Sequence, residues 1–559
     1  MRNLKECLPR RSPARTKAGG VKYWPEGVLG AVCLVFFGLY GFLYQGLPGV
    51  GEGTETLIFN QPDEMANYAF IKEWSLRGKV GIVEPLAEVS LSQVHPRSMT
   101  VVEGRLVPIG FPGFIAVMSS IIRPMVWLFG ENSFNWLVVK ITPLVAVLSA
   151  WLMFGIIRAL GLDKRTAFIG ALTLLVLPPW WYYASRPLQA NTIFVFFVLA
   201  GLWCSLVKNN NWARFFAIGL SFGLALFVRP SEWVWMFGLI GLSGYYNREF
   251  LNFKRVFLFG LGSGMMTVIF FLTQFVFYGS WLGSGYVRPA ADGTTGLITS
   301  GPQGIYWLQA IFLPFGFNAL VIVKTMYRYG LKLFLPWVVT ALLGFGFLVA
   351  NRKQFSVLFK YALGLGMLGL WLALYYGSWQ FTDNLAGQVS IGSSQVRYFL
   401  PLYVLSIPLV SYLISLIYSW NWSGKIVAVL IGITLLGASV KSVFFKFEGL
   451  YQVRETVVQY YDWRAAILKQ TSDNAVIVTR YADKYLFPAR KVIATIDTPD
   501  GAVAVVELLR SGVPVYWYDI VTENNGSDSA VSDFTKMGIS LDKPLLTWEN
   551  LELRRFIIQ

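Results

Sequence analysis

Cysteine and histidine are scarce in this sequence, and their scarcity excludes several kinds of site. Among 559 residues there are three cysteines and one histidine, His95. Cys33 and Cys204 lie inside apolar runs, so neither a disulfide framework nor a cysteine zinc site is expected. A metal centre built from several histidines is excluded as well. We expect His95 to be a solvated side chain in a loop.

Charged residues are also few, and their distribution is uneven. Asp, Glu, Lys and Arg make up 14% of the chain, whereas 55% is hydrophobic; a soluble domain would have about 45–50% apolar residues. From Phe445 onward there are 13 basic and 15 acidic residues, so the net charge of +16 arises from the preceding part. Such a basic body suits cytoplasmic loops and anionic lipid head groups. The sequence has no basic stripe with interleaved aromatic residues outside the apolar runs, so nucleic-acid binding is not expected.

Apolar runs recur between short polar breaks, a pattern typical of a polytopic α-helical membrane protein. Basic clusters in the breaks set the register, because cytoplasmic loops are enriched in Lys and Arg. The predicted spans are 28–47, 134–160, 166–184, 188–207, 213–229, 231–246, 256–278, 333–350, 356–377, 398–420 and 425–444. This odd number of spans, about eleven, places the N-terminus in the cytoplasm and the C-terminal part outside the plasma membrane. Lys324, Arg328 and Lys332 are the exception, since this register leaves them outside.

Two further apolar stretches do not read as ordinary spans. Residues 111–130 contain Arg123-Pro124, and residues 305–323 contain proline, glycine and asparagine. We expect both to form interfacial or re-entrant helices that pack against protein.

The predicted organisation has three parts. Residues 1–24 form a basic cytoplasmic N-terminus, residues 25–445 a transmembrane domain with long outer loops at 48–133 and 279–304, and residues 446–559 a small extracytoplasmic α/β domain. In this last domain, strand-like runs alternate with helical stretches, which favours a parallel-type layer. It has no glycine-rich phosphate loop, and we assign it no catalysis.

An acidic pair opens a predicted helix in the first outer loop. Pro62 precedes Asp63 and Glu64, and all three residue types suit a helix N-terminus. A charged helix start is therefore one interpretation. The other is catalytic: a carboxylate at the outer surface can take the proton of an acceptor hydroxyl, which is a weak nucleophile without a base.

Arginine and tyrosine supply the candidate substrate contacts. Arg397 and Tyr398 open a late span, Arg186 follows an aromatic cluster, and Tyr286 and Arg288 share the second outer loop. Arginine binds phosphate oxygens in pairs and keeps its charge. Interfacial anchoring and a plain surface loop are the alternatives. Arg229 is a further candidate phosphate partner, although the Arg229-Pro230 pair is interpreted more simply as a connection between spans. Outer acids such as Glu84 are interpreted as solvated.

These motifs together resemble the GT-C membrane glycosyltransferases, in particular the protein O-mannosyltransferase and aminoarabinose-transferase branch. The motifs are Asp63-Glu64, Gly110-Phe111-Pro112-Gly113, an aromatic-Gly-Ser stretch at Tyr278 and Arg397-Tyr398-Phe399-Leu400-Pro401. The resemblance implies that Asp63 is the catalytic base and that the donor is a polyprenyl-phosphate-linked sugar. One departure concerns 186–191, where the family has an acid soon after an arginine and this chain has the amides of Gln189 and Asn191. That departure puts a second acidic site residue, or a carboxylate metal site, in doubt.

The sequence therefore predicts an inverting glycosyltransferase that acts at the outer face of the membrane. Asp63 would be the base, and Arg397 with Arg186 or Arg288 would hold the leaving phosphate. The acceptor, whether protein, lipid or glycan, stays open, as does a divalent metal. Alternatives are Glu64 as base with Asp63 as metal ligand, a transporter or flippase for lipid-linked sugars, and a non-catalytic envelope assembly protein.

Overall fold

The computed structural model describes most of the chain. The described residues are 24–50, 56–110, 112–208, 211–283, 285, 312–379, 388–494, 499–520, 534, 537–548 and 550–558.

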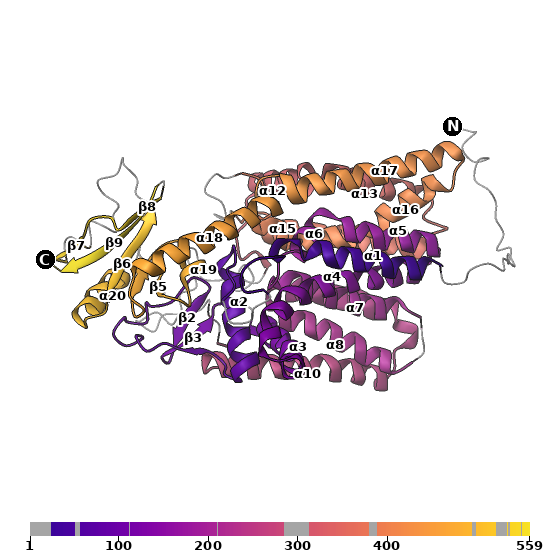
Figure 1. Ribbon diagram of the computed structural model, residues 1–559. Helices are drawn as coiled ribbons and strands as arrows, with labels where there is room; N and C mark the ends of the chain where they lie inside the picture. The colour runs from indigo at the N-terminus through magenta and orange to yellow at the C-terminus, as the bar shows by residue number, and fades with distance from the viewer. Residues whose placement is uncertain are drawn as a thin grey trace.

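Long helices lie side by side in a bundle, and a small sheet lies beyond one end of it (Figure 1). This arrangement confirms the predicted helical membrane fold with a C-terminal sheet domain. The bundle is built from α1 (Trp24–Tyr40), α4 (Phe134–Ala159), α5 (Lys164–Val176), α6 (Pro178–Ala184), α7 (Ala190–Leu206), α8 (Ala213–Val228), α9 (Trp233–Tyr246), α10 (Phe253–Tyr278), α12 (Ala319–Thr325), α13 (Leu335–Ala350), α14 (Ser356–Tyr376), α15 (Ser394–Leu405), α16 (Ile407–Tyr418) and α17 (Trp422–Val440).

Many of these helices could cross a membrane. In the described part of the chain, five helices are long and apolar enough, and they include α3 (Pro112–Phe129) beside the bundle. The number rises to nine if each of four bent pairs is one span; α1 and α7 are shorter apolar helices. A proline marks each of the four bends, at Pro178, Pro230, Pro336 and Pro408, where a residue without an N–H interrupts helical hydrogen bonding. The sharpest bend, 117°, separates α8 from α9 at Arg229-Pro230. The chain is a multi-pass membrane protein.

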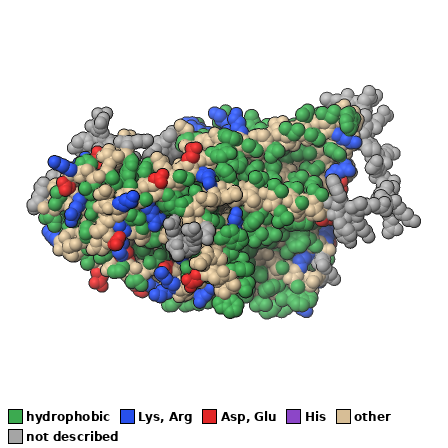
Figure 2. All heavy atoms as spheres, viewed as in Figure 1, with side chains coloured by type: hydrophobic (Ala, Val, Ile, Leu, Met, Phe, Trp, Pro, Cys, Tyr) green, Lys and Arg blue, Asp and Glu red, His purple; other side chains and the backbone are tan. Residues whose placement is uncertain are grey.

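The surface of the bundle agrees with this conclusion. Figure 2 shows hydrophobic side chains over the flank of the bundle, whereas charged side chains gather mainly toward the sheet domain on this face. Large apolar side chains are exposed on α10, α13, α14 and α17, for example Val268, Leu342, Leu370 and Ile433. Such an apolar surface is unfavourable in water, so we expect lipid chains to cover it.

The helix α3 (Pro112–Phe129) packs against α4, α8 and α10. Gly113, in its first turn, approaches α8 so closely that a Cβ atom there would lie 2.0 Å from the carbonyl oxygen of Phe227. Its last residue is separated from α4 only by residues 130–133. Both ends of α3 thus lie at the same end of the bundle. The expected interfacial helix stays a prediction, because α3 is also long and apolar enough to cross a membrane. We call this end of the bundle the site end.

The first outer loop contributes a second small sheet at the site end. The helix α2 (Pro62–Lys72) is followed by β1 (Ile82–Val83), β2 (Met99–Val102) and β3 (Arg105–Pro108). The strands pair antiparallel in the order β1-β3-β2. They connect α2 to α3 and form a layer between the bundle and the C-terminal domain (Figure 1).

The C-terminal domain begins with α18 (Leu450–Gln470), which leads from the bundle to the sheet (Figure 1). The sheet order is β5-β4-β6-β9-β7, with β8 also paired to β9. The strands β4, β5 and β6 are parallel, as predicted, and β9 joins antiparallel. The domain's other elements are β4 (Val476–Val478), α19 (Asp483–Leu486), β5 (Lys491–Ile493), α20 (Pro499–Arg510), β6 (Val515–Ile520), β7 (Ile539–Leu541), β8 (Leu546–Trp548) and β9 (Leu551–Ile558). The short β7 and β8 were not predicted.

The first loop is fastened to the C-terminal domain by charged groups and backbone. Asp483 accepts from the Arg97 backbone N–H at 2.8 Å, and its Oδ1 lies 2.6 Å from Arg97 Nη2. Lys491 pairs with Glu84, and His95 forms a β-bridge with Ile493. The expectation that His95 and Glu84 are solvated is therefore wrong, because the C-terminal domain buries both.

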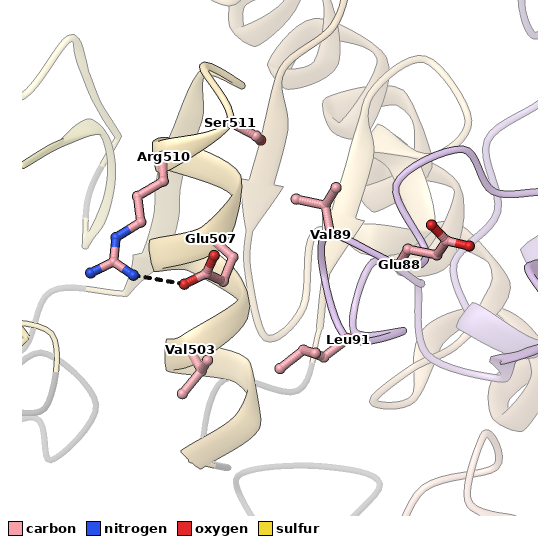
Figure 3. A pocket seen from close by; sticks show the side chains of 7 residues that line it. All are labelled: Glu88, Val89, Leu91, Val503, Glu507, Arg510 and Ser511. Carbon is pink, nitrogen blue, oxygen red and sulfur yellow. Dashed lines mark hydrogen bonds and ion pairs between the residues drawn. The ribbon is translucent and has the colours of Figure 1, made fainter.

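A shallow groove of about 640 Å³ lies along the same junction, between a turn of the first loop and α20 (Figure 3). Arg510 and Glu507 pair at 2.9 Å on the α20 side. The groove shares no residue with the site described below. Its lining residues are Glu88, Val89, Leu91, Val503, Glu507, Arg510 and Ser511.

Candidate active site

Asp63 lies in the first turn of α2, at the site end of the bundle. Pro62 opens the helix, as predicted, and the extended backbone of Gln61 directs the chain into it. The Asp63 side chain is 44% exposed. Its Oδ1 accepts from the Ser98 hydroxyl, and its Oδ2 lies 3.5 Å from Arg397 Nη1. The carboxylate is thus oriented from two sides and still reaches solvent.

Arg397 comes from the first turn of α15, 334 residues further along the chain. The Ser393 hydroxyl accepts from the backbone N–H of Gln395 and begins this helix. Arg397 also donates to the Ser394 hydroxyl, and its side chain is 17% exposed. The predicted convergence of one carboxylate and one guanidinium is therefore present in the structure.

Glu64, the residue after Asp63 in α2, forms a buried ion pair with Arg186. The Arg186 Nε and Nη2 atoms each donate to Glu64 at 2.9 Å, and the two side chains are 1% and 0% exposed. Glu64 Oε2 also accepts from the Gln61 backbone N–H at 3.1 Å, and so fixes the start of α2. Both side chains were predicted as site residues. In the structure Glu64 and Arg186 bind each other, so a substrate could bind either side chain only by breaking this ion pair.

The amides that replace the family's acid have definite partners. Gln189 Nε2 donates to Glu64 Oε1 and to Gln61 Oε1, each at 3.0 Å. The Asn191 side-chain oxygen accepts from Arg229 Nη1. Each amide therefore completes the hydrogen bonding around a buried ion pair.

Arg229 and Glu232 form the second buried ion pair, at 2.8 Å. The bend between α8 and α9 holds both residues, so the stretch interpreted as a simple connection in fact carries two buried charges. Glu232 also accepts from Trp235 Nε1 at 2.6 Å and from the Tyr376 hydroxyl at 3.0 Å. These bonds tie α9 to α14.

An aromatic row runs from this pair toward the mouth of α15. The Arg229 guanidinium lies 4.9 Å from the ring centre of Tyr398, a cation–π distance. Tyr398 stacks on Tyr376 with ring centres 4.3 Å apart. Phe315 continues the row, stacked on Tyr376 and, at 3.7 Å, on Trp379. The Tyr398 ring thus lies between the Arg229 guanidinium and the Tyr376 ring.

The start of the second outer loop packs on the first. The Tyr278 hydroxyl donates to the Pro108 carbonyl at 2.7 Å, and Gly279 ends α10 with a positive φ of 68°. Tyr286 and Arg288, predicted to bind substrate, lie outside the described residues.

A metal site is not evident in the described ranges. Between residues 24 and 558, with the gaps given above, no three His, Cys, Asp or Glu side chains form a group that could hold a metal ion. The two first-loop carboxylates diverge, since Asp63 meets Ser98 and Arg397 while Glu64 meets Arg186.

Two site residues were not recognised in the sequence, Ser98 and Glu232, and Arg229 was considered as a phosphate partner but interpreted as part of a connection. Ser98 belongs to no motif, and its positive φ of 63° is visible only in the structure. Arg229 and Glu232 did carry a signal, because ionisable residues three apart between apolar helices need partners near a membrane.

No family model and no curated protein matches this sequence. Solved structures do match. The Archaeoglobus fulgidus oligosaccharyltransferase in the apo form has a TM-score of 0.55 at 14% identity, covering 92% of this chain and 71% of that one. The same organism's AglB, in complex with an inhibitory peptide and a dolichol-phosphate, gives 0.53 at 13% identity, over 91% and 71% of the chains.

A third structure covers nearly the whole of both chains. ArnT from Cupriavidus metallidurans, bound to undecaprenyl phosphate, has a TM-score of 0.50 at 13% identity, covering 96% of this chain and 98% of that one. At such identities the likeness concerns the fold. The chain has the fold of the GT-C membrane glycosyltransferases, as its motifs suggested.

Proposed function

We propose that this protein is a membrane glycosyltransferase that moves a sugar from a polyprenyl-phosphate donor to an acceptor hydroxyl, with inversion. The observation that carries the proposal is the approach of Asp63 and Arg397 to 3.5 Å across 334 residues of sequence. The fold supports the class of reaction, because ArnT was solved with undecaprenyl phosphate and AglB with dolichol-phosphate and a peptide.

Asp63 acts as the general base. Its carboxylate takes the proton of the acceptor hydroxyl, and the hydroxyl oxygen attacks the anomeric carbon of the sugar from the face opposite the phosphate. The bond from the anomeric carbon to the phosphate oxygen breaks, and the lipid phosphate leaves with that electron pair. The Ser98 hydroxyl donates a hydrogen bond to Asp63 Oδ1 and so fixes the orientation of the carboxylate.

Arg397 stabilises the leaving phosphate. Negative charge grows on the phosphate oxygens as the bond breaks, and a fixed guanidinium lowers the energy of that charge. The faces of the neighbouring Tyr398 ring are covered by Arg229 and Tyr376, so in this proposal Tyr398 meets the donor with its ring edge. Arg186 has no such role in this proposal, because Glu64 holds it in the buried pair.

The alternative with Glu64 as base is less well supported. A base must reach the proton that it takes, and the Glu64 side chain is 0% exposed and accepts from Arg186, Gln189 and Gln61.

Loss of the Arg397 guanidinium is expected to reduce transfer strongly. We expect Arg397→Ala to lower kcat by about 100- to 1,000-fold, the range for removing one preorganised transition-state donor. Arg397→Lys would recover part of the loss, since the charge stays but paired hydrogen bonding does not. Single-turnover release of lipid phosphate is the measurement. Arg77→Ala, which removes an exposed arginine of the first outer loop, is the control. Equal kcat in the Arg397→Ala and wild-type proteins would remove Arg397 from the mechanism.

The function is tested on the full chain in lipid nanodiscs. The protein is incubated with a panel of polyprenyl-phosphate sugars and candidate acceptors, and mass spectrometry follows released lipid phosphate and glycosylated product. Both products are expected for at least one donor. Vectorial movement of an intact donor across a vesicle membrane, with no cleavage, would favour the transporter alternative instead.

A further inference from the structure

Lys484 brings a cation from the C-terminal domain to the site. It lies in α19, which packs against α18 on one side and α2 on the other (Figure 1). Since α2 carries Asp63 and Glu64, α19 packs on the helix that holds the proposed base although Lys484 is about 420 positions away in sequence. The sequence analysis assigned no chemistry to this domain.

The neighbour of Lys484 is held firmly. Asp483 is buried and accepts from Arg97 at three atoms: the backbone N–H at 2.8 Å, Nε at 3.0 Å and Nη2 at 2.6 Å. Ser98, the next residue after Arg97, donates to Asp63. Two consecutive residues of the first loop therefore connect α19 to the proposed base and fix where Lys484 lies.

The ammonium of Lys484 is left without an anionic partner of its own. Its Nζ lies 4.7 Å from the ring centre of Tyr460 on α18, and no acceptor for it is found among the residues that the structure describes. The nearby carboxylates are occupied, Asp483 by Arg97 and Glu64 by Arg186. The side chain is half-buried, so a charge there lacks full hydration. A half-buried cation without a counter-ion is suited to an anionic ligand.

We propose that Lys484 binds a phosphate oxygen of the lipid-phosphate substrate, so that the C-terminal domain completes the donor site. This inference rests on the proposed function in naming a lipid phosphate, but its test measures binding and needs no turnover. Arg397 and Lys484 would then approach the phosphate from the bundle and from the C-terminal domain, respectively.

The pKa of Lys484 gives the expected pH dependence. Burial, with Arg97 nearby, lowers this pKa to about 8. Below pH 8 the ammonium is charged and attracts phosphate; as the pH rises through 8 it loses its proton and the attraction. The charged and titratable groups around it are Arg97 of the first loop, Asp483 of its own helix, Glu64 of α2, Arg186 after α6 and Tyr460 of α18.

The test compares binding of farnesyl phosphate, farnesol and inorganic phosphate to the full-length protein in nanodiscs. Lys484→Met keeps the apolar stem over Tyr460 and removes the charge. We expect it to weaken farnesyl phosphate binding about 10- to 100-fold, the worth of one hydrogen bond to a charged group, and to leave farnesol binding unchanged. Lys469→Met, which changes an exposed lysine at the end of α18, is the control and should match wild type.

Two further arms make the outcome decisive. Lys484→Arg should restore binding at pH 7 and abolish the loss of affinity that wild type shows above pH 8. Inorganic phosphate identifies the source of the anion. If binding of farnesyl phosphate depends on Lys484 and binding of inorganic phosphate does not, Lys484 recognises a lipid phosphate. Unchanged farnesyl phosphate affinity in a folded Lys484→Met protein would overturn the proposal. Failure of the proposed function would appear as absent transfer with Lys484-dependent binding intact.

Discussion

Asp63→Asn is expected to lower the rate of sugar transfer by about 100- to 10,000-fold, the usual contribution of a positioned general base. Asparagine keeps the shape of the side chain and can still accept from Ser98, but it cannot take a proton from the acceptor. The variant should insert and fold normally, because the Asp63 side chain is 44% exposed and its contact with Arg397 is long, at 3.5 Å. Single-turnover formation of glycosylated product measures the effect.

Two controls separate chemistry from structure in this experiment. Asp63→Glu retains a carboxylate at a shifted position and should keep a small part of the activity. Glu73→Gln removes another carboxylate of the first loop and should have activity near wild type. Wild-type turnover in Asp63→Asn would exclude Asp63 as the base, and another group would then have to take the proton.

Arg186→Leu is expected to destabilise the protein by about 3–5 kcal/mol, the typical result of removing one partner of a buried ion pair. Glu64 would remain with 0% exposure and lose both guanidinium hydrogen bonds. Its remaining partners, Gln189 and the Gln61 backbone N–H, are neutral. The apparent unfolding temperature in nanodiscs should fall well below that of wild type.

The double variant Glu64→Gln with Arg186→Leu tests whether the unpaired Glu64 charge causes the loss of stability. Glutamine can still accept from the Gln61 backbone N–H, and no buried charge remains, so most of the lost stability should return. Equal stability of the Arg186→Leu and wild-type proteins would show that Glu64 is not held by Arg186. If Arg186 bound phosphate instead, its removal would affect donor affinity more than stability.

The sequence was most informative where a rule is local. Apolar runs and proline breaks predicted the helices, and Pro62 with its acidic neighbours predicted the start of α2. The parallel strands β4, β5 and β6 also followed from their alternation with helices. The meeting of Asp63 and Arg397 required the family resemblance as well, because nothing local relates two residues 334 positions apart.

The partners of buried charges could not be predicted in this way. Arg186 was assigned to phosphate because it is an arginine on the predicted outer face, but the fold places it against Glu64. Arg229 was interpreted as part of a connection because Arg229-Pro230 marks a break between two predicted spans, and its partner Glu232 was not recognised. His95 and Glu84 were expected in water, and only the docking of the C-terminal domain buries them. Each of these cases concerns a polar side chain whose partner is set by tertiary packing.

The fastening of the first loop to the C-terminal domain has a consequence for how such chains can be recombined. A chimera that exchanges only residues 446–559 would leave Arg97, Glu84 and His95 facing foreign surfaces. The base would then lose its orientation even though no residue of the bundle had been altered. A graft that preserves activity must carry the segment 84–98 along with the C-terminal domain, as one transplantable unit.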